Sequence, residues 1–337
     1  MSDLWKNTVL DPEGTVTQKA KEVFDLIEFT SENIEFGNIE ALLTRCEAYL
    51  LVKSNGLVGD FVQNVRDKTL TMCTEFLVDK SSHEYMDDKL EAHCTFLHRL
   101  SRRRVRDPRL RIFTTNYDLC FERAAALQRL ICVNGFSYAF PRVYDPSYFS
   151  FDFVRRSQSS TGMGDYLEGV FQLMKLHGSV NWVRRSDGSI EELASPSASE
   201  VCLIYPASGK YHQSYVQPHL ELISQYLSGL REPNTCVIVV GYGFNDDHLS
   251  EPILAAAKTN PRLKLIIVDI KAAETIGGNA TPINKYWKDL DVLSKRGEDI
   301  WFINAPFAEF VQMIPDLKTL SPAQQLEKTI VDIGRQQ

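Results

Sequence analysis

Apolar residues recur at helical spacing through the first third of the chain, and almost no strand pattern interrupts them. The spacing is clearest in four stretches, at 23–34, 39–50, 61–77 and 90–100. A helix with this spacing carries one apolar face that must be covered. We therefore expect four helices packed on one another between residues 16 and 104, with Asn38 as the N-cap of the second.

After residue 105 the pattern changes to short apolar runs separated by amphipathic stretches. The runs predict strands at 109–116, 171–177, 235–240, 263–269 and 301–304. The stretches between them predict helices at 117–130, 217–230, 246–259 and 282–295. The third and fourth strands are almost purely apolar, which is typical of strands covered on both faces. This alternation predicts an α/β fold with a Rossmann-type parallel sheet between layers of helices.

Two internal segments fit neither pattern. Residues 137–165 are rich in aromatic residues, Ser, Pro and Gly, which predicts an irregular insertion or lid, and residues 184–200 predict an exposed hairpin or loop. The chain from about residue 321 reads as a polar helix or tail. We divide the chain into a helical block at 1–105, an α/β core at 106–315 and a polar C-terminal segment at 316–337.

Composition narrows the class of protein. The 337 residues are 44% hydrophobic and 24% charged, as in folded soluble proteins and unlike fibrous or disordered chains. No apolar run approaches the ~18 residues of a membrane span, and the first residues lack a signal-peptide pattern. Seven cysteines without a CxxC pair predict free thiols rather than a disulfide framework. We expect a cytoplasmic protein.

The charge distribution leaves two readings of one basic run. A net charge of −7 argues against nucleic acid wrapped around the whole surface. Seven arginines nevertheless fall within thirteen residues: Arg99, Arg102, Arg103, Arg104, Arg106, Arg109 and Arg111. Cations are favoured at the C-terminal end of a helix, which gives the structural reading. The functional reading is a contact with nucleic acid or an acidic partner.

Polar residues follow the first predicted strand directly, in the sequence Thr114-Thr-Asn-Tyr-Asp118. Ligands of doubly wound sheets bind at the carboxyl ends of strands. The Asn116 amide has both donors and acceptors for a ribose hydroxyl or a water, and Asp118 can orient a neighbour. The structural alternative is that Thr115 or Asn116 caps the helix expected from Tyr117.

A histidine ends the second predicted strand, in Lys175-Leu-His-Gly-Ser179. Histidine titrates near neutral pH and suits general-base catalysis, and Gly178 would let a ligand approach the backbone. The structural alternative is a core histidine whose hydrogen bonds are satisfied. The other histidines and cysteines show no spacing of a zinc site, so we expect no metal.

The third strand end is glycine-rich and acidic, in Val240-Gly-Tyr-Gly-Phe244 followed by Asp246 and Asp247. Glycines here permit a tight turn and the close approach of a phosphate or ribose. The acidic residues also favour a helix N-terminus through the helix dipole, without any ligand. The third glycine of a dinucleotide-binding fingerprint is absent, so this motif by itself leaves both readings open.

The order of the three strand ends resembles the sirtuin-like family. The resemblance covers residues 1 to about 310 and includes the segment from Asn38 to Leu43. It is closest to a bacterial antiphage-defence branch, and within it to the sirtuin-like subunit of sirtuin–HerA systems. The similarity implies a sirtuin-like Rossmann-type sheet with a helical insertion, and chemistry at the bond between nicotinamide and ribose.

Site roles follow from the resemblance by position. Asn116 would hold the attacking water or the ribose hydroxyls, and Asp118 would support Asn116 or the ribose. His177 would act as the general base or polarise the ribose. Contacts with NAD are implied for Thr114, Thr115, Asn116, Asp118, Gly178, Ser179, Gly241, Gly243, Phe244 and Asp247. Deacetylating sirtuins usually carry a four-cysteine zinc ribbon, which this sequence lacks. The resemblance therefore favours hydrolysis of NAD to nicotinamide and ADP-ribose.

One part of the family pattern is missing. The family begins with a strand and a glycine-rich loop that cradles the pyrophosphate, whereas Gly14 and Gly37 are the only glycines before residue 55 and follow no strand. We expect the chain to start just past that unit. This departure motivates the alternative of a catalytically impaired scaffold or assembly subunit. In either case the resemblance implies a homo-oligomer and a partner, first a HerA-type hexameric ATPase and second a short Argonaute.

Overall fold

The computed structural model describes most of the chain: residues 2–30, 39–79, 81–82, 84–103, 107–156, 165–194, 196, 200–203, 217–276, 284–317 and 326. The predicted cap at Asn38 lies outside these residues, as does nearly all of the predicted C-terminal tail. All seven cysteines are described and free. Within the described residues, no helix is both long and apolar enough to span a bilayer.

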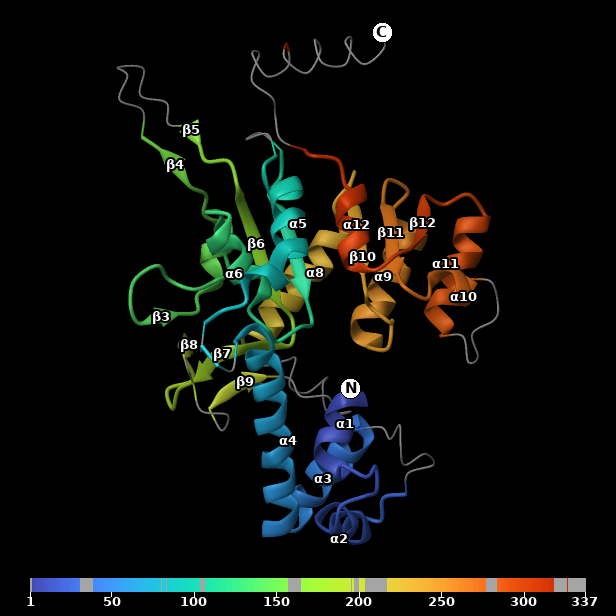
Figure 1. The fold of residues 1–337 in the computed structure, drawn as a ribbon. Coiled ribbons are helices and arrows are strands. Elements are labelled where there is room, and N and C mark those ends of the chain that lie inside the picture. Colours follow the sequence, from blue (N-terminus) through green and yellow to red (C-terminus); the bar gives the residue numbers. More distant parts are fainter. Residues whose placement is uncertain are drawn as a thin grey trace.

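The N-terminal helices form a block with its own core (Figure 1). Its members are α1 (Ser2–Val9), α2 (Gln18–Ile27), α3 (Ile39–Val52) and α4 (Gly56–Thr74). Trp5, Leu42 and Phe61 are among the side chains buried between them. Asn55 caps α4 by accepting a hydrogen bond from the Val58 amide. The apolar spacing therefore identified three mutually packed helices correctly.

The fourth predicted helix packs elsewhere. The helix α5 (Glu91–Ser101) follows two short 3₁₀ turns, Glu75–Leu77 and Asp87–Leu90. Its buried face, which includes Phe96 and Leu97, joins the core beneath the parallel strands rather than that of α1–α4. The expectation that all four helices pack on one another was wrong here, because helical spacing predicts an apolar face but not what covers it.

The parallel strands form two three-stranded sheets. One has the order β1-β6-β2, from β1 (Leu110–Thr114), β2 (Ile131–Val133) and β6 (Val170–Lys175). The other has the order β10-β11-β12, from β10 (Cys236–Val240), β11 (Lys264–Asp269) and β12 (Ile300–Asn304). All pairings in both are parallel. The predicted α/β class with a parallel sheet is confirmed, and each predicted strand exists within two residues of its expected bounds.

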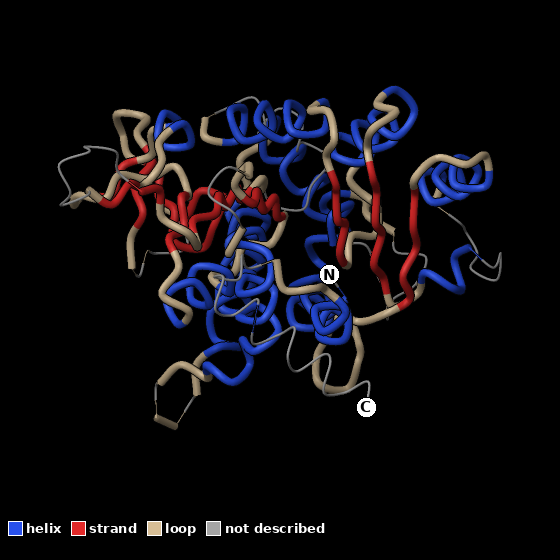
Figure 2. Tube along the Cα trace, turned by 90° about the horizontal axis from the view of Figure 1, so that it is seen from above, coloured by secondary structure: helices blue, strands red, loops and turns tan. Residues whose placement is uncertain are grey.

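The same two helical layers cover both sheets (Figure 2). One layer contains α8 (His219–Arg231), α9 (Asp247–Thr259) and α11 (Lys285–Lys295), and the other contains α5, α6 (Cys120–Leu127) and α12 (Phe307–Met313). A short helix, α10 (Ala272–Ile276), follows β11. On the α5 side, Ile112 of β1 and Val268 of β11 belong to one apolar cluster. The two sheets therefore behave as halves of a single layer.

The two halves are not joined by a strand ladder in the described part of the chain. There, β1 pairs only with β6 and β10 pairs only with β11, and no backbone hydrogen bond connects β1 to β10. The halves are linked instead through side chains and helices. For example, Arg111 of β1 forms a 2.6 Å ion pair with Glu232, at the C-cap of α8 shortly before β10.

A small antiparallel sheet was not predicted. It has the order β3-β8-β7-β9, from β3 (Arg142–Val143), β7 (Gly178–Arg184), β8 (Ile190–Glu192) and β9 (Val201–Leu203). The turn between β7 and β8 is the expected hairpin near 184–200, closed by the Arg185 amide on the Ser189 carbonyl at 2.9 Å. The expected insertion contains a 3₁₀ helix (Pro146–Ser150) and the pair β4 (Val154–Arg155) and β5 (Asp165–Tyr166).

The described arginines of the basic run have partners within the chain. Arg99, in the last turn of α5, donates to the carbonyls at the C-terminal end of α12, including that of Ile314 at 2.6 Å. Carbonyls at a helix C-terminus lack partners within the helix and favour a cation. Arg109 forms a bidentate ion pair with Asp152, and Arg103 donates to the Leu100 carbonyl. These contacts favour the structural reading of the run; Arg104 and Arg106 lie outside the described residues.

Candidate active site

The first two polar strand ends lie side by side. β1 and β6 are adjacent parallel strands with Thr114 opposite Lys175, so Asn116 and His177 each stand two residues beyond the paired positions. The Leu176 amide donates to the Thr114 carbonyl at 2.8 Å, which continues the pairing past the strands. The register therefore brings the predicted amide and imidazole to one edge of the sheet.

The loop after β1 leaves the Asn116 side chain exposed. Thr114 Oγ1 accepts a hydrogen bond from the backbone N–H of Asn116 at 3.1 Å. Asp118 Oδ1 accepts one from the backbone N–H of Cys120 at 3.0 Å. The helix α6 begins at Cys120 instead of Tyr117, and its N-cap is Leu119, so neither Thr115 nor Asn116 caps it as the alternative reading expected. Asn116 is exposed, and no hydrogen bond within the described residues occupies its carboxamide. That group is therefore available to a ligand.

His177 pairs with a second histidine that sequence reasoning did not assign a role. Its Nε2 lies 3.4 Å from Nε2 of His248 on α9, and the two rings stack with centroids 5.5 Å apart. His177 is only 3% exposed, whereas His248 is half-buried. A hydrogen bond between the two Nε2 atoms requires one ring to donate and the other to accept, so the tautomers of the two histidines are coupled. His248 directly follows the acidic pair of the third motif, which was the available signal.

A third histidine lies behind the site. His219 Nδ1 is 3.2 Å from the Leu176 carbonyl, and its Nε2 is 3.8 Å from Cys202 Sγ. Burial lowers the pKa of His219 to about 4, so the ring is neutral at physiological pH. A neutral ring that faces a carbonyl through Nδ1 carries its proton there. His219 thus fixes the backbone just before His177.

The structure gives a reason for glycine at position 178 that the sequence did not reveal. Its φ is +89°, and a Cβ at this position would collide with the carbonyl oxygen of Cys202 in β9. The close approach therefore comes from the chain itself and closes β7 against β9, rather than from a ligand. Gly241 differs: it is exposed, its φ is +60°, and an added Cβ there would meet nothing within 4 Å.

The third motif divides into exposed and buried parts. Gly241, Gly243 and Asp247 are exposed. Phe244 is fully buried and lies edge-on to Trp287 with ring centroids 5.5 Å apart. Its side chain therefore belongs to the core, and the expectation that Phe244 lines the NAD site was wrong. Its φ of +55° shapes the turn that carries the motif.

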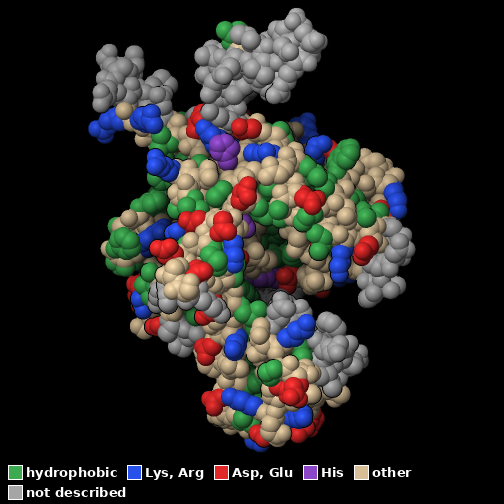
Figure 3. All heavy atoms as spheres, viewed as in Figure 1, with side chains coloured by type: hydrophobic (Ala, Val, Ile, Leu, Met, Phe, Trp, Pro, Cys, Tyr) green, Lys and Arg blue, Asp and Glu red, His purple; other side chains and the backbone are tan. Residues whose placement is uncertain are grey.

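A cleft of about 730 Å³ adjoins the histidine pair. His248 and Asp247 line it together with residues of α8 and the start of α11. Tyr286 donates a 2.8 Å hydrogen bond to Asp247 Oδ1, and Lys285 lies 3.3 Å from the same oxygen. The tyrosine bond and then the lysine lower the pKa of Asp247. The face drawn in Figure 3 is hollowed between the two halves of the molecule, and histidine side chains are visible at the lower margin of the hollow.

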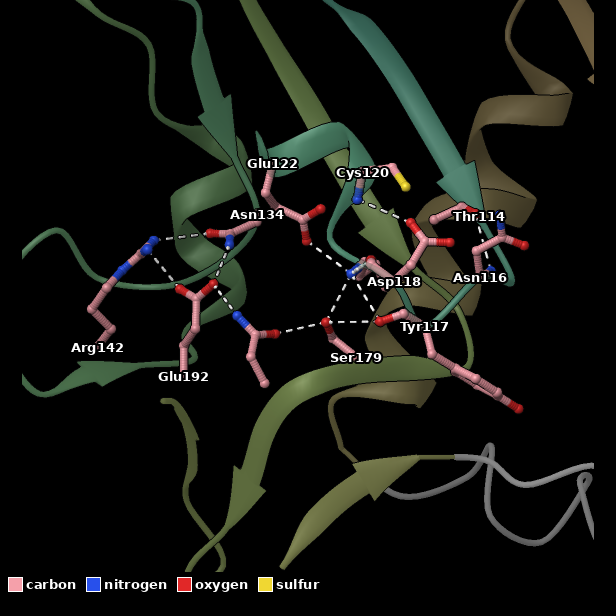
Figure 4. Close-up of polar contacts among 12 residues, drawn as sticks. Thr114, Asn116, Tyr117, Asp118, Cys120, Glu122, Asn134, Arg142, Ser179 and Glu192 are labelled. Carbon is pink, nitrogen blue, oxygen red and sulfur yellow. Dashed lines mark hydrogen bonds and ion pairs between the residues drawn. The ribbon is translucent and has the colours of Figure 1, made fainter. Parts of the chain in front are cut away.

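A buried polar network lies beneath the Asn116 loop (Figure 4). Lys175 Nζ is 2.9 Å from Glu122 Oε1 and 2.8 Å from Ser179 Oγ, and it also donates to the Asp118 carbonyl. Ser179 is fully buried and donates to Asn181 Oδ1 at 2.6 Å. The Ser179 hydroxyl is therefore bonded within the protein, and the expectation that it contacts NAD was wrong.

No cluster of metal-ligating side chains occurs in the part of the chain that the structure describes. The site consists of an exposed amide and a buried imidazole at adjacent strand ends, next to a second imidazole and a carboxylate that line the cleft. Such groups can position a water, accept a proton and bind ribose hydroxyls without a strong nucleophile.

The family model of the SIR2-like domain matches residues 110–292, more than half of the chain. The chain belongs to the SIR2-like family. The match contains all three strand-end motifs, so the predicted sirtuin-like family is confirmed. A comparison with curated proteins returned no match. SIR2-like proteins use NAD, so the family match supports an NAD-related function for this chain.

Proposed function

We propose that this SIR2-like protein hydrolyses the bond between nicotinamide and ribose in NAD, releasing nicotinamide and ADP-ribose. The observation that carries the proposal is that the exposed Asn116 and the paired His177 follow adjacent parallel strands, with His248 hydrogen-bonded to His177. Asn116 and His177 thus stand at strand ends, where doubly wound folds bind their ligands.

The chemistry requires positioned polar groups more than a nucleophilic side chain. Cleavage of a glycosidic bond passes through an oxocarbenium-like state. The C1′–N bond breaks and its electron pair neutralises the pyridinium ring, so nicotinamide leaves uncharged. A water oxygen then bonds to C1′ and passes its proton to the imidazole pair. Asn116 would hold that water or the ribose hydroxyls.

The cleft supports the binding of the rest of NAD. Asp247 is exposed at its margin, and its lowered pKa keeps it an acceptor for ribose hydroxyls. Gly241 offers an open backbone position at the end of β10. A cleft of about 730 Å³ is within the size range of small-molecule sites.

The direct test is nicotinamide release from NAD by the wild type and by Asn116→Ala, followed by chromatography. We expect the variant to lose at least about a hundredfold in rate, the scale of losing a group that stabilises a transition state. Asn7→Ala is the matched control, because Asn7 is exposed on α1, away from the cleft. Equal rates in the wild type and Asn116→Ala would refute the role of Asn116. Binding of NAD without any turnover would support the scaffold alternative instead.

We further propose that the activity depletes NAD during antiphage defence, in a homo-oligomer with a HerA-type ATPase. The support is the sequence resemblance together with exposed apolar residues at the end of α3, where Leu51 and Val52 are about nine-tenths exposed. Light scattering of the purified chain tests self-association. A strict monomer at high concentration, for the wild type and for Leu51→Ser alike, would contradict it.

A further inference from the structure

We infer that Lys175 is a positioning residue: its buried ammonium group fixes the loop that presents Asn116. This inference rests on the proposed function for its catalytic consequence only. Its structural half concerns the loop itself and is measurable without any substrate.

Lys175 is a charged side chain held almost entirely away from water. It is 2% exposed at the end of β6, and lysine is rarely buried to this extent without partners. In the chain it stands one residue before Leu176 and two before His177. A buried ammonium costs free energy unless its donors are satisfied, so its contacts indicate what it holds in place.

Those contacts converge on the Asn116 loop. The ammonium donates to the Asp118 carbonyl and lies 3.4 Å from the Tyr117 carbonyl, so it touches the two residues that follow Asn116. It also donates to Ser179 Oγ at 2.8 Å, on the strand after His177. One cation therefore ties the backbone after Asn116 to the strand after His177.

A relay of hydrogen bonds anchors this contact to the antiparallel sheet (Figure 4). Ser179 donates to Asn181 at 2.6 Å, and Asn181 Nδ2 donates to Glu192 Oε1 at 2.9 Å. Glu192 in turn pairs with Arg142 at 2.6 Å. The relay runs through β7, β8 and β3, and it fixes the Ser179 hydroxyl that accepts from Lys175.

Glu122 balances the charge but does not explain the geometry. It lies 2.9 Å from Lys175, burial raises its pKa, and Lys175 opposes that rise. Its Oε2 is buried and has no hydrogen-bond partner among the described residues. Charge balance needs only a nearby cation, whereas the contacts with Tyr117, Asp118 and Ser179 need an ammonium at this position. The two roles can be separated by mutation.

The decisive variant is Lys175→Met combined with Glu122→Gln. Lys175→Met alone leaves a buried carboxylate without its cation and can fail to fold, whereas the double variant removes both charges together. We expect the double variant to fold, with faster hydrogen exchange at the amides of Asn116, Cys120 and Val180, which report on the loop and its bond to β7. Nicotinamide release should lose about tenfold or more in kcat, with KM changed less than about threefold.

Lys89→Met is the matched control, because Lys89 also donates to a backbone carbonyl, that of Phe76 at 3.0 Å, but on the exposed surface. It should leave exchange at the loop and the rate of release unchanged. If the three reporter amides of the double variant exchange as slowly as those of the wild type, the inference is overturned, because Lys175 would then only balance charge. If the wild type releases no nicotinamide, the proposed function fails, while the exchange comparison still decides the role of Lys175.

Discussion

At the residue scale, the second histidine of the site changes what His177 can do alone. His248 Nε2 is 3.4 Å from His177 Nε2, so the proton positions of the two rings are coupled. General-base catalysis depends on where a proton goes after its transfer. In the proposed mechanism, His248, which lines the cleft, would connect the buried His177 to that cleft.

We expect His248→Ala to lower kcat for nicotinamide release about tenfold or more, somewhat below the usual general acid–base contribution because His177 remains. His98→Ala provides the comparison, because His98 lies on α5 beside Arg102, outside the cleft. Steady-state kinetics of both variants measure the difference. A His248→Ala variant with wild-type rates would remove His248 from the mechanism.

His219 makes the stability of the fold sensitive to acid. Its folded-state pKa of about 4 lies below the usual value of 6.5, because burial disfavours the charged ring. The unfolded chain therefore binds more protons between these two values, and the free energy of unfolding falls as pH drops through this window. From about pH 7 to about pH 4.5 this one group should account for a loss of about 2 to 3 kcal/mol.

Urea unfolding at the two pH values checks this expectation. His219→Gln retains a donor for the Leu176 carbonyl but cannot titrate, so its loss of stability on acidification should be smaller than that of the wild type by that amount. Equal losses in both proteins would show that other groups govern acid unfolding.

At the element scale, the closure of β7 against β9 depends on one glycine. A side chain at Gly178 meets both a φ of +89° and the Cys202 carbonyl, whereas Gly188 has a similar φ of +87° and nothing within 4 Å of an added Cβ. Backbone strain of this kind costs on the order of 1–3 kcal/mol, and a core clash adds a similar amount.

Gly178→Ala should thus lower the free energy of unfolding by about 3 kcal/mol or more, and Gly188→Ala by about 1 kcal/mol. Denaturant unfolding of both variants measures the difference between their free energies of unfolding. Because both positions have a similar φ, that difference reports the clash with the Cys202 carbonyl and not the backbone strain. Similar losses for the two variants would mean that β9 can move away from β7 at little cost.

The elements that the sequence predicted well are those whose pattern is local. The apolar run at 235–240 is close to β10, and the polar residues after it begin the third motif as expected. The antiparallel sheet was not predicted because β7 starts at Gly178, within the His177 motif. Its residues up to Val183 are all buried, so the strand shows no alternation of apolar and polar positions. The burial of Ser179 and Phe244 depends on Lys175 and Trp287, which are partners that no local pattern reveals.

At the scale of the whole molecule, the site is divided between the two halves of the parallel layer. Asn116 and His177 follow strands of the first half, whereas His248 and Asp247 belong to the helix after β10. Among the described strands, β1 and β10 are edge strands that do not pair with each other. Edge strands exchange their unpaired amides more readily than central ones.

Hydrogen exchange should accordingly show lower protection in β1 and β10 than in the central strands β6 and β11. ADP-ribose, if bound across the cleft, should slow exchange in both edge strands at once. Uniform protection across all four strands would indicate that the layer behaves as one continuous sheet.

The divided layer also has a consequence for heating. No ladder bonds join the described strands of the two halves, whereas the apolar clusters on both faces of the layer span both halves. A small shift of one half against the other would therefore separate the two imidazoles before these shared clusters unfold. Loss of turnover should then precede the calorimetric transition, and cooling from that interval should restore full activity, because the shared clusters stay packed.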